Sequence, residues 1–371
     1  HLTLRGAPGV SAVEDAVRMY REIARMLAAE RVQVLQEKAY GPAATRDAVL
    51  DVRRTCLARA GLDPATPCTY VEGHAGRAGM QGVQIFGAVP RAERGACVSR
   101  VVGRNGVEGT ELVTRRGRTL FLAAIEGREA DGTLAADPRR QAERMFLRAE
   151  EALVERGMAF AQVARTWIYL QDLLGWYREF NAVRTGFLGA RGITGGNGGR
   201  PFPASTGIQG HRGAEACLMD LCAIAAATPE AQVRPVLGSA RQREAFAYGS
   251  SFSRAMRVAQ GGWQTLFISG TASLDAAGRT LHAGDRRAQI QETLACVAAL
   301  LAEQGGTLAD VCSATVFGKD EATLRLFAEM AAAGSVPAFP HVPVLADVCR
   351  PDLLVEIEAL AEIPDQAPVR A

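Results

Sequence analysis

Two glutamates stand two residues apart in the apolar segment VEIEAL near the C-terminal end of the chain, where a well-placed carboxylic acid could donate a proton. Successive side chains of a strand alternate between its faces, so Glu356 and Glu358 share one face with Leu360. On an arbitrary strand both glutamates would face water. If helices cover the other face and a neighbouring unit abuts this one, the glutamates border a cleft, where burial raises a carboxyl pKa above its ordinary value of about 4.3.

The overall composition excludes several classes of partner. The 42 Lys and Arg residues nearly balance the 40 Asp and Glu residues, and no run of five or more like charges occurs. The sequence therefore shows no footprint for nucleic acid or a membrane surface. No apolar run is long enough to span a membrane, and no segment resembles a signal peptide. We expect a globular, cytoplasmic protein whose partner is a small molecule.

The cysteines and glycines do not indicate a metal or cofactor site. The eight cysteines form no C-x-x-C pair and have no metal-ligand spacing with the five histidines. The glycine- and proline-rich stretch 189–210 lacks a lysine in Walker spacing and no strand leads it into a dinucleotide-binding turn. We interpret this stretch as a connecting loop and expect a protein without a metal or cofactor.

An internal repeat is the strongest indication of the fold. Residues 137–172 align without gaps over residues 285–320 at an offset of 148, and TLFLAAIEG (119–127) pairs with TLFISGTAS (265–273). A duplicated segment of this length indicates one supersecondary unit that is used more than once.

Each copy is predicted to follow the order β, α, β, α. A strand and a loop lead to an amphipathic helix, which a Gly turn at Gly157 or at Gly305 ends. A second strand and a second helix follow, each helix beginning at an Asp suited to an N-cap, Asp172 or Asp320. A strand over 353–360 closes the second copy. This order predicts an α+β fold in which helices cover one face of each sheet.

Three motifs of the second copy resemble the YjgF/RidA family. These are FISGTASLDAAGRTL with the helix after it, ADVCSATVFGKD, and the terminal VEIEALAE. The resemblance implies mixed sheets with helices on one face, and units that assemble in threes with clefts between neighbours. Two linked units and a degenerate third would form an internal pseudo-trimer within one chain.

The implied domain organisation has four parts. Residues 1–105 are an N-terminal region that could be the degenerate unit, 106–190 are the first YjgF-like unit, 191–244 are a Gly/Pro-rich loop and helix connection, and 245–371 are the C-terminal unit. With its trimer built internally, the protein is expected to be a monomer or a weak homo-oligomer.

Four further motifs resemble a narrower family, the chorismatases, which are built from YjgF-like units and cleave chorismate with release of pyruvate. These motifs are WIYLQDLLGWYREFNAVRTGF, PFPASTGIQG, AFAYGSSFSRAMRV and CRPDLLVEIEA. A simple RidA-type enamine deaminase is disfavoured, because an Arg that would grip its substrate carboxylate is missing and His341 stands near that position.

Chorismate carries two carboxylates, so its site needs cations or oriented donors at two ends. Arg254 and Arg257 would share one face if their segment were helical, and Arg forks bind carboxylates in pairs of hydrogen bonds. Arg254, set among Tyr248, Ser251 and Ser253, is the first candidate, and Arg184 ranks below it. Resemblance to the chorismatase loop adds Thr206 and Gln209 as contacts to substrate oxygens. His74 and His211 are weaker candidates.

The resemblance also implies roles for three residues in the chemistry. Glu356 is the expected proton donor to the enolpyruvyl methylene, and Glu358 either orients it or meets solvent. Chorismatases of the 3-hydroxybenzoate type carry a Cys seven residues before the acid and a Gly after the Ser of the strand motif. Cys349 and Gly270 occupy these positions, so we expect 3-hydroxybenzoate and pyruvate as products.

Several alternatives stay open at this point. Hydrolysis of chorismate to trans-3,4-dihydroxycyclohexa-1,5-diene carboxylate, or formation of mixed 3- and 4-hydroxybenzoate, would keep the family but change the product. A RidA-type deaminase and a non-catalytic metabolite sensor would use the same cleft for another purpose. The purely structural interpretation of Cys349 is that it is a small buried hydrophobic residue.

Overall fold

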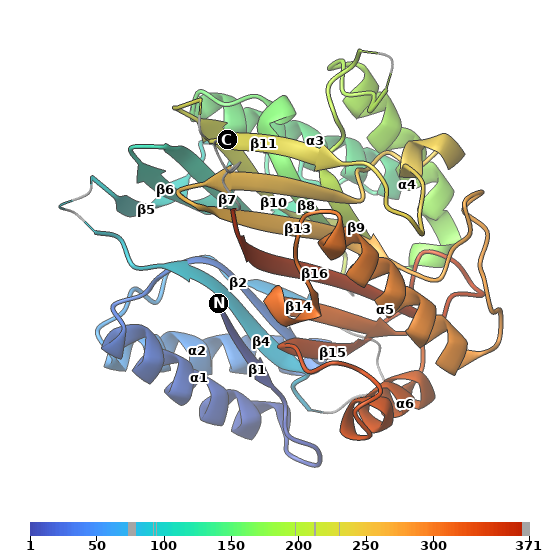
Figure 1. Ribbon diagram of the computed structural model, residues 1–371. Coiled ribbons are helices and arrows are strands. Elements are labelled where there is room, and N and C mark those ends of the chain that lie inside the picture. The colour runs from blue at the N-terminus through green and yellow to red at the C-terminus, as the bar shows by residue number, and fades with distance from the viewer. Residues whose placement is uncertain are drawn as a thin grey trace, which may run out of the picture.

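The computed structural model describes residues 1–72, 79–91, 93, 95–196, 198–210, 213–229 and 231–365. Three β-sheets face one another in the interior, and the helices lie on the outside (Figure 1). We call the sheets the N-terminal, the middle and the C-terminal sheet, in chain order. This arrangement confirms the predicted α+β class with mixed sheets and helices on one face.

The N-terminal sheet has four strands in the order β1-β4-β2-β3. Its elements, with a short 3-10 turn over Ala43–Thr45, are β1 (Leu2–Arg5), α1 (Ala12–Ala29), β2 (Gln33–Gly41), α2 (Arg46–Arg59), β3 (Thr69–Glu72) and β4 (Gly82–Ala88).

The middle sheet has six strands in the order β5-β6-β7-β10-β8-β9. Its elements, with a 3-10 turn over Phe160–Gln162, are β5 (Cys97–Val102), β6 (Glu108–Thr114), β7 (Gly117–Glu126), α3 (Pro138–Glu155), β8 (Val163–Leu170), α4 (Leu173–Gly189), β9 (Ala204–Gln209) and β10 (Cys217–Ala226).

The C-terminal sheet also has six strands, in the order β11-β12-β13-β16-β14-β15. Its elements, with 3-10 turns over Ala245–Tyr248 and Leu308–Asp310, are β11 (Gln232–Val236), β12 (Ala255–Gln260), β13 (Trp263–Thr271), α5 (Arg286–Ala302), β14 (Val311–Gly318), α6 (Glu321–Ala332), β15 (His341–Leu345) and β16 (Val355–Pro364).

The three sheets share one topology. The middle and C-terminal sheets carry two extra strands each, β5-β6 and β11-β12. Without them, the strands of every unit lie side by side in the order first, fourth, second, third. In each sheet the second and third strands are parallel and the other pairs antiparallel. Each second strand also has a bulge at an equivalent residue, Leu35, Ala164 or Cys312. We therefore interpret the N-terminal region as a third unit of the same kind.

The sheets close on one another in a ring. The third strand of each unit contacts the next unit: β3 contacts β7, β9 contacts β13, and β15 contacts β1 and β4. The molecule therefore has three equivalent seams, which is the internal pseudo-trimer expected from the sequence. Because every sheet turns its helix-free face inward, that face is buried as well.

Local capping follows the sequence at some helix ends and not at others. Asp320 caps α6 as predicted, since its carboxylate accepts the N–H of Thr323 at 2.7 Å. Asp172 precedes α4 but makes no side-chain cap, because it adopts a left-handed conformation with φ 44°. The amide oxygen of Gln209 accepts the N–H of Leu173 instead, at 2.8 Å.

The observed strands shift the predicted boundaries. The middle sheet begins at β5 and ends at β10, whereas residues 106–190 were predicted for its unit. Residues 191–244 were predicted to be a loop and a helix, yet they contain β9, β10 and β11. In particular, Ala204–Gln209 of the glycine-rich stretch is a buried strand parallel to β8, because a neighbouring strand supplies its hydrogen bonds.

Candidate active site

A cleft opens at the seam between the middle and C-terminal sheets, with an empty volume of about 540 Å³. It is lined by residues of α4, β9, the segment 248–254, β13, and the segment between β15 and β16. The lining residues are Tyr177, Arg184, Ser205, Gly207, Tyr248, Ser250, Phe252, Arg254, Gly270, Ala272, Leu274, Cys349, Arg350 and Glu356. Five of the predicted residues therefore meet Glu356 in one pocket: Gly270, Cys349, Arg254, Tyr248 and Arg184.

Glu356 is held on the inner face of β16. Val355 and Ile357 point into the core under the helices, as the alternation predicted, and Glu356 is 4% exposed. Burial, and after it the nearby charge of Glu358, raise the pKa of Glu356 to about 8. Arg165 and Arg350 act in the opposite direction. The carboxyl group is thus mostly protonated near neutral pH, which is the state that a proton donor requires.

Gly270 makes room for this carboxyl group. A Cβ atom at position 270 would lie 2.0 Å from Oε1 of Glu356, so the carboxyl group could not keep its place beside a side chain there. The close approach occurs where β13 and β16 lose regular register between Ile268 and Thr271. A side chain at position 270 would therefore displace the Glu356 carboxyl group from its present place.

Cys349 contacts the same carboxyl group. It lies seven residues before Glu356, in the segment between β15 and β16, and a side-chain hydrogen bond joins the two residues. Burial and the charge of Glu356 together raise the pKa of the Cys349 thiol. A protonated thiol can donate a hydrogen bond, so Cys349 is placed to orient the acid.

Three arginines supply positive charge around the pocket. Arg254 is 2% exposed, donates from Nε to the carbonyl of Arg243 at 2.9 Å, and lies over the rings of Tyr248 and Phe252. Arg184 is also buried and donates to Asn181 at 2.7 Å, while its Nε has no hydrogen-bond partner among the described residues. Arg350 was not singled out from the sequence, although it follows Cys349 directly.

Three predicted contact residues do not line the pocket. Ser253 donates to the carbonyl of Phe202 at 2.7 Å and joins β9 to the segment before β12. Gln209 caps α4, as described above. Thr206 lies behind the pocket wall, where its hydroxyl accepts hydrogen bonds from Arg165 at 2.6 Å and from the N–H of Gly270 at 3.0 Å. Buried polar groups are satisfied in this way, so these residues support the site from outside.

Other sequence interpretations change in the structure. Arg257 does not share a face with Arg254, because Ala255–Gln260 is a strand and not a helix; Arg257 pairs with Asp365 at 2.8 Å. His341 begins β15 and packs against Phe327 and Phe339. His74 and His211 lie outside the described residues.

Two residues near the acid were missed besides Arg350. Tyr177 of α4 lines the cleft, although its spacing resembles that of a core residue. Arg165 of β8 is 1% exposed and donates to both Thr206 and Glu358. Every residue of β8 is buried, so no alternation in VARTWIYL distinguishes the functional face.

The geometry supports acid chemistry on an anionic substrate. A buried, protonated carboxylic acid faces a pocket with three arginines, so a substrate with carboxylates would be held while Glu356 donates a proton. Among the described residues, no group of His, Cys, Asp and Glu could hold a metal ion. No helix in the described part of the chain is long and apolar enough to cross a membrane.

Comparisons with known proteins agree with this fold. A family model described as endoribonuclease L-PSP matches residues 243–363. A curated protein named chorismatase, from Streptomyces hygroscopicus, is 29% identical over 224 residues, which cover 55% of this chain and 63% of that protein. The match therefore spans less than two thirds of the length of that relative. A solved chorismatase structure covers 88% of this chain and 92% of its own, with a TM-score of 0.62 and 21% identity.

The three sheets and the matched family model define a protein of repeated YjgF/RidA-like units. Within that class, the sequence match agrees with the resemblance to the chorismatases that the four motifs indicated, and the solved structure confirms the fold.

Proposed function

We propose that this protein is a chorismatase that converts chorismate to 3-hydroxybenzoate and pyruvate. One observation carries the proposal: the buried Glu356, with a pKa raised to about 8, faces an arginine-lined pocket. The sequence and fold matches to chorismatases support it. At pH 7 about nine tenths of a carboxyl group with this pKa is protonated.

The first step is protonation of the substrate. Arg254, Arg184 and Arg350 hold the ring carboxylate and the enolpyruvyl carboxylate, and Glu356 gives its proton to the terminal methylene carbon of the enol ether. The enol ether becomes an oxocarbenium ion, and Glu356 becomes a carboxylate. A general acid of this kind contributes roughly 10²- to 10⁴-fold to a rate.

The second step separates the products. The ring 4-hydroxyl oxygen attacks the neighbouring ring carbon, the bond from that carbon to the side-chain oxygen breaks, and the side chain leaves as pyruvate. The hydroxyl proton returns to the Glu356 carboxylate. The arene-oxide-like intermediate then opens to 3-hydroxybenzoate, so no water is consumed. Cys349 and Gly270 favour this course because they fix the carboxylate close to the ring.

The eight cysteines are free thiols, which supports the proposal that the protein works in a reducing cytoplasm. Because three units close the ring within one chain, we propose that the site needs no second copy of the protein.

The test is to incubate the purified protein with chorismate, follow pyruvate by a coupled assay and separate the ring products by chromatography. Equal amounts of pyruvate and 3-hydroxybenzoate are expected. Pyruvate with the dihydrodiol acid would establish hydrolysis instead, and mixed hydroxybenzoates would indicate the mixed synthase. Absence of pyruvate would overturn the proposal and leave the deaminase and the sensor as explanations of the cleft.

A further inference from the structure

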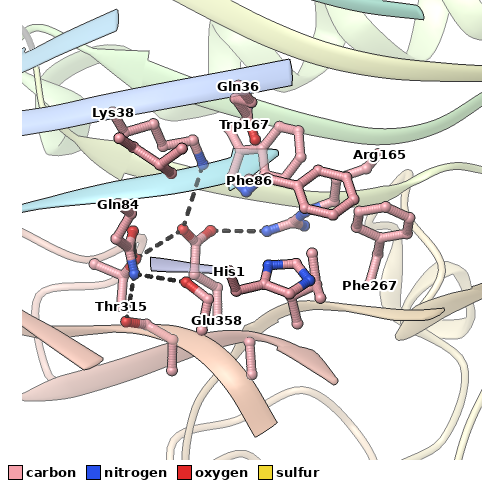
Figure 2. Close-up of a pocket in the computed structure, with 15 residues that line it drawn as sticks. His1, Gln36, Lys38, Gln84, Phe86, Arg165, Trp167, Phe267, Thr315 and Glu358 are labelled. Carbon is pink, nitrogen blue, oxygen red and sulfur yellow. Dashed lines mark hydrogen bonds and ion pairs between the residues drawn. The ribbon is translucent and has the colours of Figure 1, made fainter. Parts of the chain in front are cut away.

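A second pocket lies where the inner faces of all three sheets meet. Its walls include Lys38 of β2, Gln84 and Phe86 of β4, Arg165 and Trp167 of β8, and Glu358 of β16 (Figure 2). Its empty volume is about 460 Å³, close to that of the cleft, and the two pockets share no lining residue. The proposed reaction does not use this pocket.

The lining of the second pocket has more cations than carboxylates. Figure 2 shows the Glu358 carboxylate between two cations, with Arg165 Nη2 at 2.7 Å and Lys38 Nζ at 3.9 Å. The Thr315 hydroxyl also donates to Glu358, at 3.1 Å. Glu358 is thus the one carboxylate of the lining, opposite the two cations Arg165 and Lys38, while the carboxylate of Asp220 also attracts Lys38 from outside the lining. The nearby Asp220 is outside the lining and accepts hydrogen bonds from Thr69 and from the N–H of Ala124.

The two cationic side chains, Arg165 and Lys38, can each donate a further hydrogen bond. Arg165 Nη1 is buried and has no hydrogen-bond partner among the described residues. The ammonium group of Lys38 is in a buried side chain, 3.9 Å from Glu358 and 3.9 Å from the centre of the Trp167 ring, and Asp220 also attracts it. A buried donor without an acceptor is unfavourable, so an acceptor at this place would stabilise the pocket.

Aromatic side chains form one part of the pocket wall. Trp167 lies beneath both cations and contacts Phe267 edge-on at 6.3 Å between ring centroids. Phe86 forms another wall beside Arg165, and the His1 ring stacks on it with 4.6 Å between ring centroids (Figure 2). Flat apolar walls with positive charge at one end suit a planar ring that bears a single carboxylate.

We propose that this pocket binds an aromatic monocarboxylate, with its carboxylate on Lys38 Nζ and Arg165 Nη1 and its ring against Trp167, Phe86 and Phe267. Arg165 connects the pocket to the cleft, since its Nη2 donates to Thr206, whose hydroxyl accepts the N–H of Gly270 beside Glu356. A ligand on Arg165 would therefore change the hydrogen bonds that hold Gly270 beside the acid. If the proposed function holds, its own ring product belongs to this ligand class and would act here as a regulator.

The test is calorimetric titration with benzoate. Because benzoate could also enter the cleft, the titration uses Arg254→Met protein, in which carboxylate binding at the cleft is weakened. Benzoate binding is expected to persist in Arg254→Met and to weaken at least tenfold in Arg254→Met/Lys38→Met. Absence of binding in Arg254→Met, or undiminished binding in the double variant, would overturn the proposal.

A second variant covers the case in which loss of Lys38 prevents folding. Ser313 lines the pocket from a partly exposed position, so Ser313→Leu fills the space without removing a charge. Arg254→Met/Ser313→Leu should show the same loss of benzoate binding, and full binding would contradict the assignment. Because titration measures binding and not turnover, failure of this proposal and failure of the proposed chorismatase reaction are separate results.

Discussion

The three seams of the ring have the same strand architecture, but only one of them has an acid at the position of Glu356. On the second strand of each unit, the residue five positions after the bulge pairs with a residue of the fourth strand. The pairs are Tyr40 with Gly82, Tyr169 with Leu218, and Phe317 with Glu356. A carboxyl group thus occurs at this position in the C-terminal unit alone.

In the other two seams, side chains fill the space that corresponds to the open cleft. At Gly82 a Cβ atom would lie 2.7 Å from a methyl group of Val342, so β15 already occupies that space. In the middle sheet, Leu218 packs in the core between the sheets, and Ala124 stands at the position of Gly270 in the repeat. Repetition of the fold therefore supplies three seams, and a site arises only where an acid and empty space coincide.

Removal of the acid from the open seam should have the largest effect on turnover. Glu356→Gln should reduce turnover of chorismate by roughly 10²- to 10⁴-fold while chorismate still binds, because the amide keeps the shape but has no acidic proton. Steady-state kinetics and calorimetry measure the two effects. Glu362→Gln, on the same strand outside the cleft, is the control. Full turnover by Glu356→Gln would remove the acid assignment.

Placing an acid in a filled seam should cost stability and bring no activity. Leu218 is 4% exposed, so Leu218→Glu buries a carboxyl group among apolar residues and should destabilise the fold by at least about 2 kcal/mol in urea denaturation. Combined with Glu356→Gln, it should not restore turnover. Restored turnover would show that the seams are more alike than their packing indicates.

Filling the space beside the acid should impair the open seam. Gly270→Ala forces the Glu356 carboxyl group to move, because the new Cβ would lie 2.0 Å from Oε1. We expect turnover to fall about tenfold to a hundredfold and the dihydrodiol acid to rise among the ring products. Gly186→Ala in α4, where a Cβ meets nothing within 4 Å, is the matched control. Equal kinetics of the two variants would contradict the spatial role of Gly270.

The pH dependence should report the same acid. The pKa of Glu356 is raised, so its proton is present below pH about 8 and is lost as the pH rises through that value. We expect kcat/KM to fall about tenfold per pH unit above pH 8. Circular dichroism over the same range checks that the fold persists. A flat profile from pH 7 to 9.5 would argue against proton donation by Glu356.

The smallest expected effect is that of the thiol. Cys349→Ala removes a hydrogen bond that lowers the pKa of Glu356, so the alkaline limb of the profile should move to higher pH while turnover changes less than about tenfold. Chromatography should detect a shift of product toward the dihydrodiol acid. Cys349→Ser keeps a donor and should behave more like the parent. An unchanged profile and product ratio would return Cys349 to a packing role.

Several features of the fold were predictable because they depend on local sequence. The repeat at an offset of 148 placed α3 with α5 and β8 with β14, and Gly157 and Gly305 end helices with φ of 67° and 76° as expected. Strand alternation placed Glu356 and Glu358 on the face opposite Val355 and Ile357. The N-terminal unit was harder to recognise, because it shares strand order with the others without a common motif.

The site was predictable only in part, because only some of its residues lie in a recognisable motif. Glu356, Cys349 and Gly270 lie in motifs that resemble a family, so their types and spacing carried information. Arg350 and Tyr177 did not stand out, and Thr206, Gln209 and Ser253 turned out to support the seam behind the pocket. Whether a polar residue touches a cavity or a neighbouring strand depends on side-chain direction across a seam, which spacing along the chain does not encode.

By itself, the sequence determined the class of fold, the repeated unit and the identity of a candidate acid, because hydrophobic periodicity, turn residues and motifs are properties of short segments. Only the tertiary structure decided which of three seams stays open and how strongly Glu356 holds its proton. The pKa of that group depends on burial and on the charges of Glu358, Arg165 and Arg350, which come from β16, β8 and the segment before β16. Residues so far apart in the chain act on one carboxyl group only after the ring of sheets has closed.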